Sequence, residues 1–313
     1  MRYFSVFLLI TLALAVSCTK PGGTGVSVNS AFRPLIPPDT KALAGANLDN
    51  LKASPFYQRH RSELNFPLLD AMSERIGFDP RRDISDLVIA WNGMDAVAIA
   101  RGGFNVDAVA SKLSGFGTRP TQYQGHTIFT SDREAVGFLK HGVAIAGSER
   151  AVRSEINLEN NRRGGVPDEL QARLAAIPKG DQIWAVSRAG LALPDSFVRS
   201  DIDSALSNIT GYINATSVGI GLDSGTHMQA EIVCISNEGA QRVRDALRGG
   251  IGLARLTTRD DQSDLLKLFD AIQVSQDQQT VHIKADVSGE LTDKLLAYLP
   301  QIRNRADQML KQR

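Results

Sequence analysis

Cysteine is almost absent from this sequence, which contains Cys18 and Cys234 and no others. A chain of 313 residues can bury enough apolar surface to fold without disulfides. The formal net charge is only +1, so the composition does not indicate a nucleic-acid partner. After Val16, no second apolar run approaches the length of a membrane-spanning helix. These absences predict a folded body without crosslinks, and they argue against a nucleic-acid-binding protein.

The familiar catalytic motifs are also missing. The sequence has no Gly-x-Ser-x-Gly nucleophile elbow, no Gly-x-x-x-x-Gly-Lys phosphate loop and no His-Glu-x-x-His zinc motif. Cys234 alternates with apolar residues in a strand-like segment, which predicts a buried structural thiol and not a nucleophile. No cofactor is predicted. An enzyme stays open as an alternative, because catalytic groups need only meet in space.

The N-terminus carries the most specific pattern in the chain. Arg2 precedes an apolar run from Phe4 to Val16, and small residues then lead to Cys18. This layout is typical of a secretory signal peptide, and the run is short for a membrane span. The order Ala15-Val16-Ser17-Cys18 resembles the lipobox of bacterial lipoproteins. The resemblance implies that residues 1–17 are removed and that Cys18 is lipidated.

This resemblance also implies a location. The mature protein is expected to be exported and anchored to the membrane of the cell envelope through the lipid on Cys18. Thr19 stands where an aspartate favours inner-membrane retention, which indicates the outer membrane if the source is Gram-negative. Residues 18–35 are rich in Gly, Ser, Thr and Pro and predict a flexible tether. A short strand at Val26–Val28 is the alternative.

The rest of the chain contains an internal similarity. Ile36–Ala44 is echoed by Ile177–Ala185, and the predicted order of strands, hairpins and helices after each copy is similar. This pattern predicts an α+β fold of two tandem similar units, 36–165 and 166–313, each with mainly antiparallel hairpins and flanking helices. The second unit has an insertion near 249–269, whose glycine-rich start predicts the end of a helix. Chance similarity is the alternative, and a shared sheet is an open question.

Two further segments resemble bacterial envelope proteins that have no established activity. Pro37–Leu48 is similar to the turn and small-residue strand with which those proteins begin, and Gly77–Ile84 is similar to one of their linkers. The resemblance implies a duplicated α+β domain in the cell envelope and brings no site residues.

One acidic cluster has a spacing found in metal sites. Asp260, Asp261 and Asp264 form an Asp-Asp-x-x-Asp pattern, which magnesium-diphosphate enzymes use on a helix. Those enzymes are all-helical and carry two such clusters, whereas this chain is predicted to be α+β with one. Acidic residues also stabilise the start of a helix, and a helical stripe follows at Leu265–Phe269. We therefore predict helix-start acids, with a metal site as the alternative.

Together these features favour a non-enzymatic binding or interaction role for a lipid-anchored envelope protein. The ligand is open between an envelope protein, a glycan and an amphiphile. One alternative is a periplasm-facing carrier of a lipid or other amphiphile, which needs a deep apolar pocket. The other is a hydrolase with dispersed catalytic residues, which needs a cleft with paired acid and base groups.

Overall fold

The computed structural model of this chain describes residues 25–62, 74, 79–115, 117–132, 134–188, 190, 209–259 and 261–296. Within these residues the first half supplies the strands β1 (Ala42–Asn47), β2 (Ile84–Trp91), β3 (Ala96–Gly102), β4 (Arg119–Tyr123), β5 (His126–Ser131), β6 (Glu134–Leu139) and β7 (Val143–Ser148). Its helices are α2 (Leu48–Ala53), α3 (Pro55–His60), α5 (Pro80–Asp83), α6 (Val106–Gly115) and α7 (Glu149–Asn161), with short 3-10 turns η1 (Arg33–Leu35) and η2 (Lys140–Gly142).

The second half has a similar make-up. Its strands are β8 (Ile183–Ser187), β9 (Ile213–Leu222), β10 (Thr226–Cys234), β11 (Ile272–Asp277) and β12 (Thr280–Val287). Its helices are α8 (Asp168–Ala175), α10 (Asn237–Thr257), α11 (Ser263–Ala271) and α12 (Gly289–Leu296). None of the helices in the described ranges is long and apolar enough to cross a bilayer.

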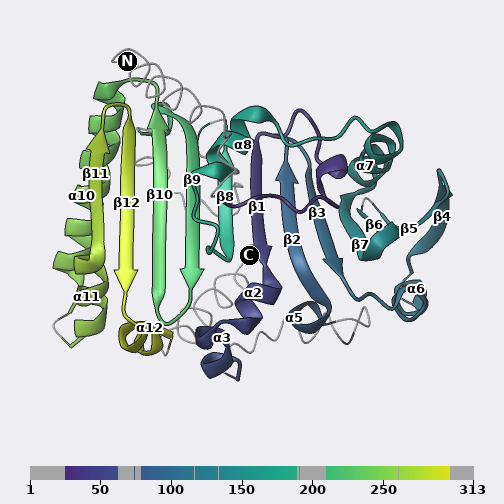
Figure 1. Cartoon of the computed structure of the whole chain (residues 1–313), viewed down its shortest axis with the longest axis horizontal. Helices are drawn as coiled ribbons and strands as arrows, with labels where there is room; N and C mark the ends of the chain where they lie inside the picture. The colour runs from purple at the N-terminus through teal and green to yellow at the C-terminus, as the bar shows by residue number, and fades with distance from the viewer. Residues whose placement is uncertain are drawn as a thin grey trace, which may run out of the picture.

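All twelve strands of the described residues belong to one sheet, in the order β11-β12-β10-β9-β8-β1-β2-β3-β7-β6-β5-β4 (Figure 1). Each pairing between neighbouring strands is antiparallel. Helices and a large antiparallel sheet agree with the predicted α+β class. Strands of both halves share one sheet, which answers the question that the sequence left open. Outward from the centre, the order β1-β2-β3-β7-β6 in the first half is matched by β8-β9-β10-β12-β11 in the second.

Local sequence explains where several elements begin. The side chains of Asn105, Ser148 and Ser288 accept hydrogen bonds from backbone N–H groups in the first turns of α6, α7 and α12, at 3.1, 3.2 and 3.3 Å. These side chains satisfy donors that a helix start leaves unpaired. The β2–β3 hairpin turns at Asn92-Gly93, where Gly93 has a φ of 104° and Asn92 Oδ1 accepts from the backbone N–H of Asp95 at 2.9 Å. The sequence predicts each of these caps and this turn, because each depends on a few adjacent residues.

The N-terminal segment, residues 25–36, is part of the core. It crosses the sheet in front of the central strands in Figure 1, and the backbone N–H of Val26 donates to the carbonyl oxygen of Ile177 at 2.9 Å. Its apolar side chains are buried in the main core: Val26, Val28, Phe32, Leu35 and Ile36. The predicted flexible tether is therefore wrong for residues 25–35. The composition of this segment is typical of a linker. However, burial of its spaced apolar side chains lowers the free energy of the folded chain more than an exposed, flexible segment would.

Helix α10 also corrects a prediction. The helix does not stop at Gly249–Gly252 but continues to Thr257. Each glycine in a helix interior costs about 1 kcal/mol relative to alanine. The helix carries an apolar stripe, Val243, Leu247 and Ile251, which packs in the second core cluster against β10, β11 and β12. Burial of this stripe across the glycines offsets their low propensity.

The two halves meet at the antiparallel pair β1 and β8. Gly45 of β1 lies directly opposite Trp184 of β8, and a Cβ atom on Gly45 would be 2.2 Å from the indole ring. Only glycine leaves room for the indole there. A second contact between the halves joins His60 of α3 to Asp293 of α12, with 2.7 Å between Nε2 and Oδ1.

Gly45→Ala is expected to destabilise the protein, because the added methyl group must displace the Trp184 ring. Overpacking of this kind costs about 1–3 kcal/mol in the free energy of unfolding, which chemical denaturation measures. Gly180→Ala is the matched control, since nothing lies within 4 Å of a Cβ atom there. Equal losses in the two variants would contradict the packing of Trp184 on Gly45.

Candidate ligand-binding site

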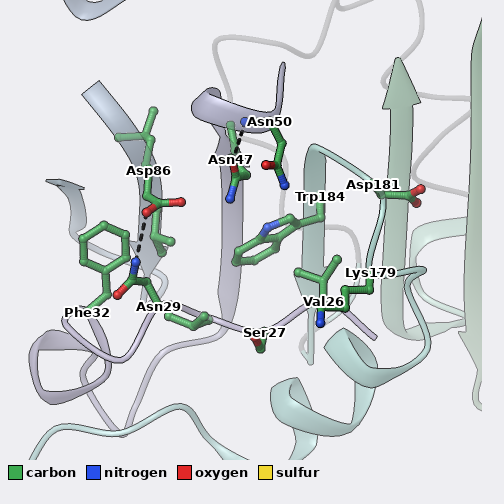
Figure 2. Close-up of a pocket in the computed structure, with 14 residues that line it drawn as sticks. Val26, Ser27, Asn29, Phe32, Asn47, Asn50, Asp86, Lys179, Asp181 and Trp184 are labelled. Atoms are coloured by element: carbon green, nitrogen blue, oxygen red, sulfur yellow. Dashed lines mark hydrogen bonds between the residues drawn. The ribbon is translucent and has the colours of Figure 1, made fainter. Parts of the chain in front are cut away.

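A cavity of about 160 Å³ lies where the halves of the sheet meet (Figure 2). We call it the central cavity. Its walls come from β1, β2 and β8, from α2, from the loop before β8 and from the N-terminal segment. Its lining includes the indole of Trp184 and the polar or charged side chains of Asn29, Asn47, Asn50, Asp86, Lys179 and Asp181.

Hydrogen bonds fix two of these amide side chains. Asn47 ends β1 and caps α2, since its Oδ1 accepts from the backbone N–H of Asn50 at 2.8 Å. Asn29 donates from Nδ2 to Asp86 Oδ2 at 2.9 Å, and its Oδ1 accepts from the backbone N–H of Ala31 at 3.0 Å. The side-chain amide of Asn50 has no hydrogen-bond partner among the described residues. The cavity therefore offers both oriented amides and unused donors and acceptors.

Trp184 forms a flat apolar wall between these polar groups. The residue is only 6% exposed, and Figure 2 shows its indole between Asn47 and Val26. No partner for its Nε1–H lies in the part of the chain that the structure describes. A buried indole with a free donor combines an apolar surface with a polar edge, as ligand-binding tryptophans do.

Formal charges at the central cavity are nearly balanced. Asp86 lies 3.6 Å from the Nε of Arg101, and its side chain is mostly buried. Lys179 is exposed and forms no ion pair within the described ranges. The lining therefore lacks the excess of positive or negative charge that a highly charged ligand requires.

An acid–base pair borders this cavity, because Asp181 is one of its lining residues. The Asp181 side chain is fully buried, and its Oδ1 is 2.8 Å from His227 Nε2 on β10. Asp181 Oδ2 is buried and has no hydrogen-bond partner among the described residues. Burial raises the pKa of Asp181, and the hydrogen bond from His227 opposes that rise. In Figure 2 the carboxylate points away from Trp184.

Two glycines of β9 make room for this pair. A Cβ atom on Gly219 would lie 2.1 Å from Asp181 Oδ2, and one on Gly221 would lie 1.8 Å from the His227 ring. The sequence Gly219-Ile220-Gly221 therefore leaves an open strip on one face of β9. Asp181 and His227 occupy that strip.

The pair is an incomplete catalytic arrangement. No serine, threonine or cysteine side chain in the described ranges is hydrogen-bonded to His227. Cys234 is buried and burial raises the pKa of its thiol, as expected for the predicted structural thiol. Asp181 and His227 supply half of what a hydrolase needs, namely an acid–base pair without a nucleophile.

The residues that the sequence singled out do not form this site. Cys18 and Asp260 lie outside the described residues. Asp264 is in the first turn of α11, as predicted for a helix-start acid, with its Oδ1 3.6 Å from Lys267 Nζ. Asp261 pairs with Arg259 at 2.8 Å instead of capping the helix. Among the described residues, no group of three or more His, Cys, Asp or Glu side chains is placed to hold a metal ion.

The residues of the central cavity and of the acid–base pair were not predicted from the sequence. Asn29, Asp86 and Trp184 are far apart in the chain and share no motif. One signal was present for the pair: glycines at alternate positions of a strand indicate that a neighbouring side chain lies across it. Gly219 and Gly221 form that pattern beside His227.

Comparison with known proteins shows likeness at the level of the fold. No protein-family model matches the chain, and no curated protein matches it. The structure is similar to crystal form III of TP0453, with a TM-score of 0.50 and 8% sequence identity over 87% of this chain and 99% of that chain. Crystal form I of TP0453 gives a TM-score of 0.48 at 9% identity, over 87% of this chain and 96% of that one. At these identities the likeness to form III shows a similar fold and nothing about function.

His227→Ala is expected to destabilise the protein more at pH 7 than at pH 4. The substitution leaves a buried Asp181 carboxylate without its partner, which costs about 1–3 kcal/mol of the free energy of unfolding. Because the folded-state pKa of Asp181 is raised, this carboxyl binds its proton more tightly in the folded chain. The stability that the Asp181 carboxyl contributes therefore falls as the pH rises. This fall is larger in His227→Ala, where the carboxylate has lost its partner, so the loss of stability caused by the substitution is smaller at pH 4 than at pH 7.

Denaturant titrations at the two pH values measure this difference. His282→Ala is the control, because His282 lies 3.5 Å from Glu231 in a pair that is about one-third exposed. A change within about 0.5 kcal/mol is expected there. A loss in His227→Ala that is the same at both pH values would rule out a buried carboxylate as its cause.

Proposed function

We propose that this protein is a lipid-anchored envelope protein whose folded body binds a small, neutral, hydroxyl-bearing ligand in the central cavity, without catalysis. A single sugar unit is the ligand class that we favour. The observation that carries this proposal is the set of amide side chains beside the Trp184 indole. Anchoring through Cys18 rests on the lipobox-like sequence alone.

The chemistry of the lining supports a hydroxyl-bearing ligand. An amide side chain donates and accepts hydrogen bonds, which matches a hydroxyl group that does both. The indole of Trp184 offers a surface for the apolar face of a ring. The volume of about 160 Å³ is close to that of an engineered cavity of about 150 Å³ that holds one benzene ring. A ligand of one ring therefore suits the space.

The same features weigh against an amphiphile as the ligand of this cavity. An acyl chain needs a long apolar space, whereas the central cavity is small and has seven polar side chains in its lining: Ser27, Asn29, Asn47, Asn50, Asp86, Lys179 and Asp181. A carrier function would need another site. The hydrolase alternative keeps one specific observation in its favour, the pair formed by Asp181 and His227.

We also propose that the two halves are tandem similar units, as the sequence suggests. Support comes from the matched order of five strands on each side of the β1–β8 junction. In both halves a helix, α6 or α10, precedes the outer hairpin and another, α7 or α12, follows it. The first half adds β4 and β5 at its edge. The central cavity then lies at the junction of the two units.

Tryptophan fluorescence tests the ligand class directly, because the chain has two tryptophans, Trp91 and Trp184. In the variant Trp91→Phe, the emission comes from Trp184. Glucose and N-acetylglucosamine are the probes, and a saturable change in emission is expected. Trp184→Phe is the matched control and is expected to show no saturable change. Absence of a saturable change in Trp91→Phe with both sugars would contradict the proposal.

Asn50→Ala is expected to weaken sugar binding by about 2–10-fold, the effect of one lost hydrogen bond. The Asn50 side chain has no partner within the described residues, so its removal leaves the fold intact. Asn160→Ala, at an exposed amide bonded to Gln124, is the control. Turnover of a bound glycoside that disappears in His227→Ala would instead favour the hydrolase alternative.

Cys18→Ser is expected to release the protein from membranes, because the attached acyl chains supply about 0.8 kcal/mol for each buried methylene group. Membrane fractionation and intact mass measure the effect. The serine variant should keep its signal peptide and lack the mass of the lipid. An N-terminus and mass identical to those of the wild-type protein would show that Cys18 is not the anchor.

A further inference from the structure

A second cavity, of about 240 Å³, lies under helix α7. We call it the α7 cavity. Its walls come from α7, from the β2–β3 hairpin and from the loop before β1, and it shares no lining residue with the central cavity. Its lining includes the polar side chains of Asp39, Thr40, Asp95, Arg150 and Glu155.

Two of these side chains are buried without partners. Glu155 is 2% exposed, and no hydrogen bond or ion pair to it exists among the described residues. Its Oε2 is fully covered, and so is the Oγ1 of Thr40, which also lacks a partner in the described ranges. An unsatisfied buried polar group costs about 1–3 kcal/mol, so two such groups in one cavity call for an explanation.

The electrostatic surroundings of Glu155 are negative. Asp39 forms no ion pair with the described residues, and its carboxylate accepts only from the Asn92 amide at 3.3 Å. Asp95 is neutralised by Arg150, which is the one cationic side chain of the lining. Burial in the first place, and the charge of Asp39 in the second, raise the pKa of Glu155 to about 8.

We propose that the α7 cavity binds the primary ammonium group of a small organic molecule, with Glu155 and Thr40 as its hydrogen-bond acceptors. This site and its ligand are separate from the sugar site and do not rest on it. An ammonium group has three N–H donors and a positive charge. It therefore satisfies the buried oxygens and matches the excess of carboxyl groups.

The geometry favours an organic cation over a metal ion. Calcium takes six to eight oxygen ligands, several of them from converging carboxylates, and magnesium takes six, of which one or two are carboxylates and several are waters. No such group of three acidic, histidine or cysteine side chains is present in the described part of the chain. The cavity is also larger than the central one and has room for a short carbon chain beside the ammonium group.

Binding should release a proton. The raised pKa keeps Glu155 mostly protonated at pH 7, and an ammonium ion binds the carboxylate form. The charged groups around this carboxyl are Asp39 from the loop before β1, Asp95 from the hairpin and Arg150 from α7 itself. As Asp95 and Arg150 neutralise each other, Glu155 is the group whose proton leaves when the ligand enters.

Titration calorimetry of the full chain with ethanolamine tests this proposal. Measurements in two buffers of different ionisation enthalpy count the protons, and release of close to one proton for each bound ethanolamine is expected at pH 7. Ethylene glycol lacks the charge, and choline keeps the charge but lacks the N–H donors. Neither is expected to bind.

Glu155→Gln is expected to weaken ethanolamine binding by about 10–100-fold, the effect of losing a hydrogen bond to a charged group, and to abolish proton release. The matched control is Glu159→Gln, one turn along α7, because Glu159 also has a buried unpartnered oxygen but does not line the cavity. Its binding should equal that of the wild-type protein. If Glu155→Gln does not fold, Thr40→Val is expected to weaken binding by about 2–10-fold.

Several results would overturn the proposal. Choline binding as tightly as ethanolamine would remove the role of the N–H donors. Equal losses in Glu155→Gln and Glu159→Gln, or a Thr40→Val variant that binds as the wild type does, would remove the assigned acceptors. Calcium binding that depends on Glu155, without binding of ethanolamine, would make the cavity a metal site instead.

Discussion

The pairing of β1 with β8 is the constraint on which the rest of the structure depends. It turns two sets of strands into one sheet, and it works because Gly45 yields the space that Trp184 takes. The indole forms one wall of the central cavity, and the N-terminal segment forms another. The contact between Gly45 and Trp184 therefore belongs both to the junction of the halves and to one wall of the central cavity.

Several buried polar groups lie where the apolar core is interrupted. Asn47 is the last residue of β1, and its side chain both caps α2 and lines the central cavity. Asp181 and His227 occupy the strip left by the glycines of β9. Glu155 lies on the buried side of α7 between Ala151 and Ile156, where an apolar residue would pack more easily.

The sequence predicted well what depends on neighbours in the chain. The caps Ser148 and Ser288 and the turn at Asn92-Gly93 are local, because each is decided by a few adjacent residues. Burial of the segment 25–35 was not predictable in this way, since its partners include Ile177, far along the chain. The central cavity likewise joins Asn29, Asp86 and Trp184 from three distant segments. Glu155 did leave a sign, a carboxylate on the apolar stripe of an amphipathic helix.

The N-terminal segment also sets how the body is held if Cys18 carries the lipid. Gly25 follows Cys18 by seven residues, a length of chain that reaches at most about 25 Å when fully extended. The sheet would thus stay close to the bilayer surface. A force applied through this short linker would act first on the bridge between Gly25 and Pro178 and on the Val26–Ile177 hydrogen bond. Val26 lines the central cavity, so a force applied through a lipid on Cys18 would reach the cavity through this segment.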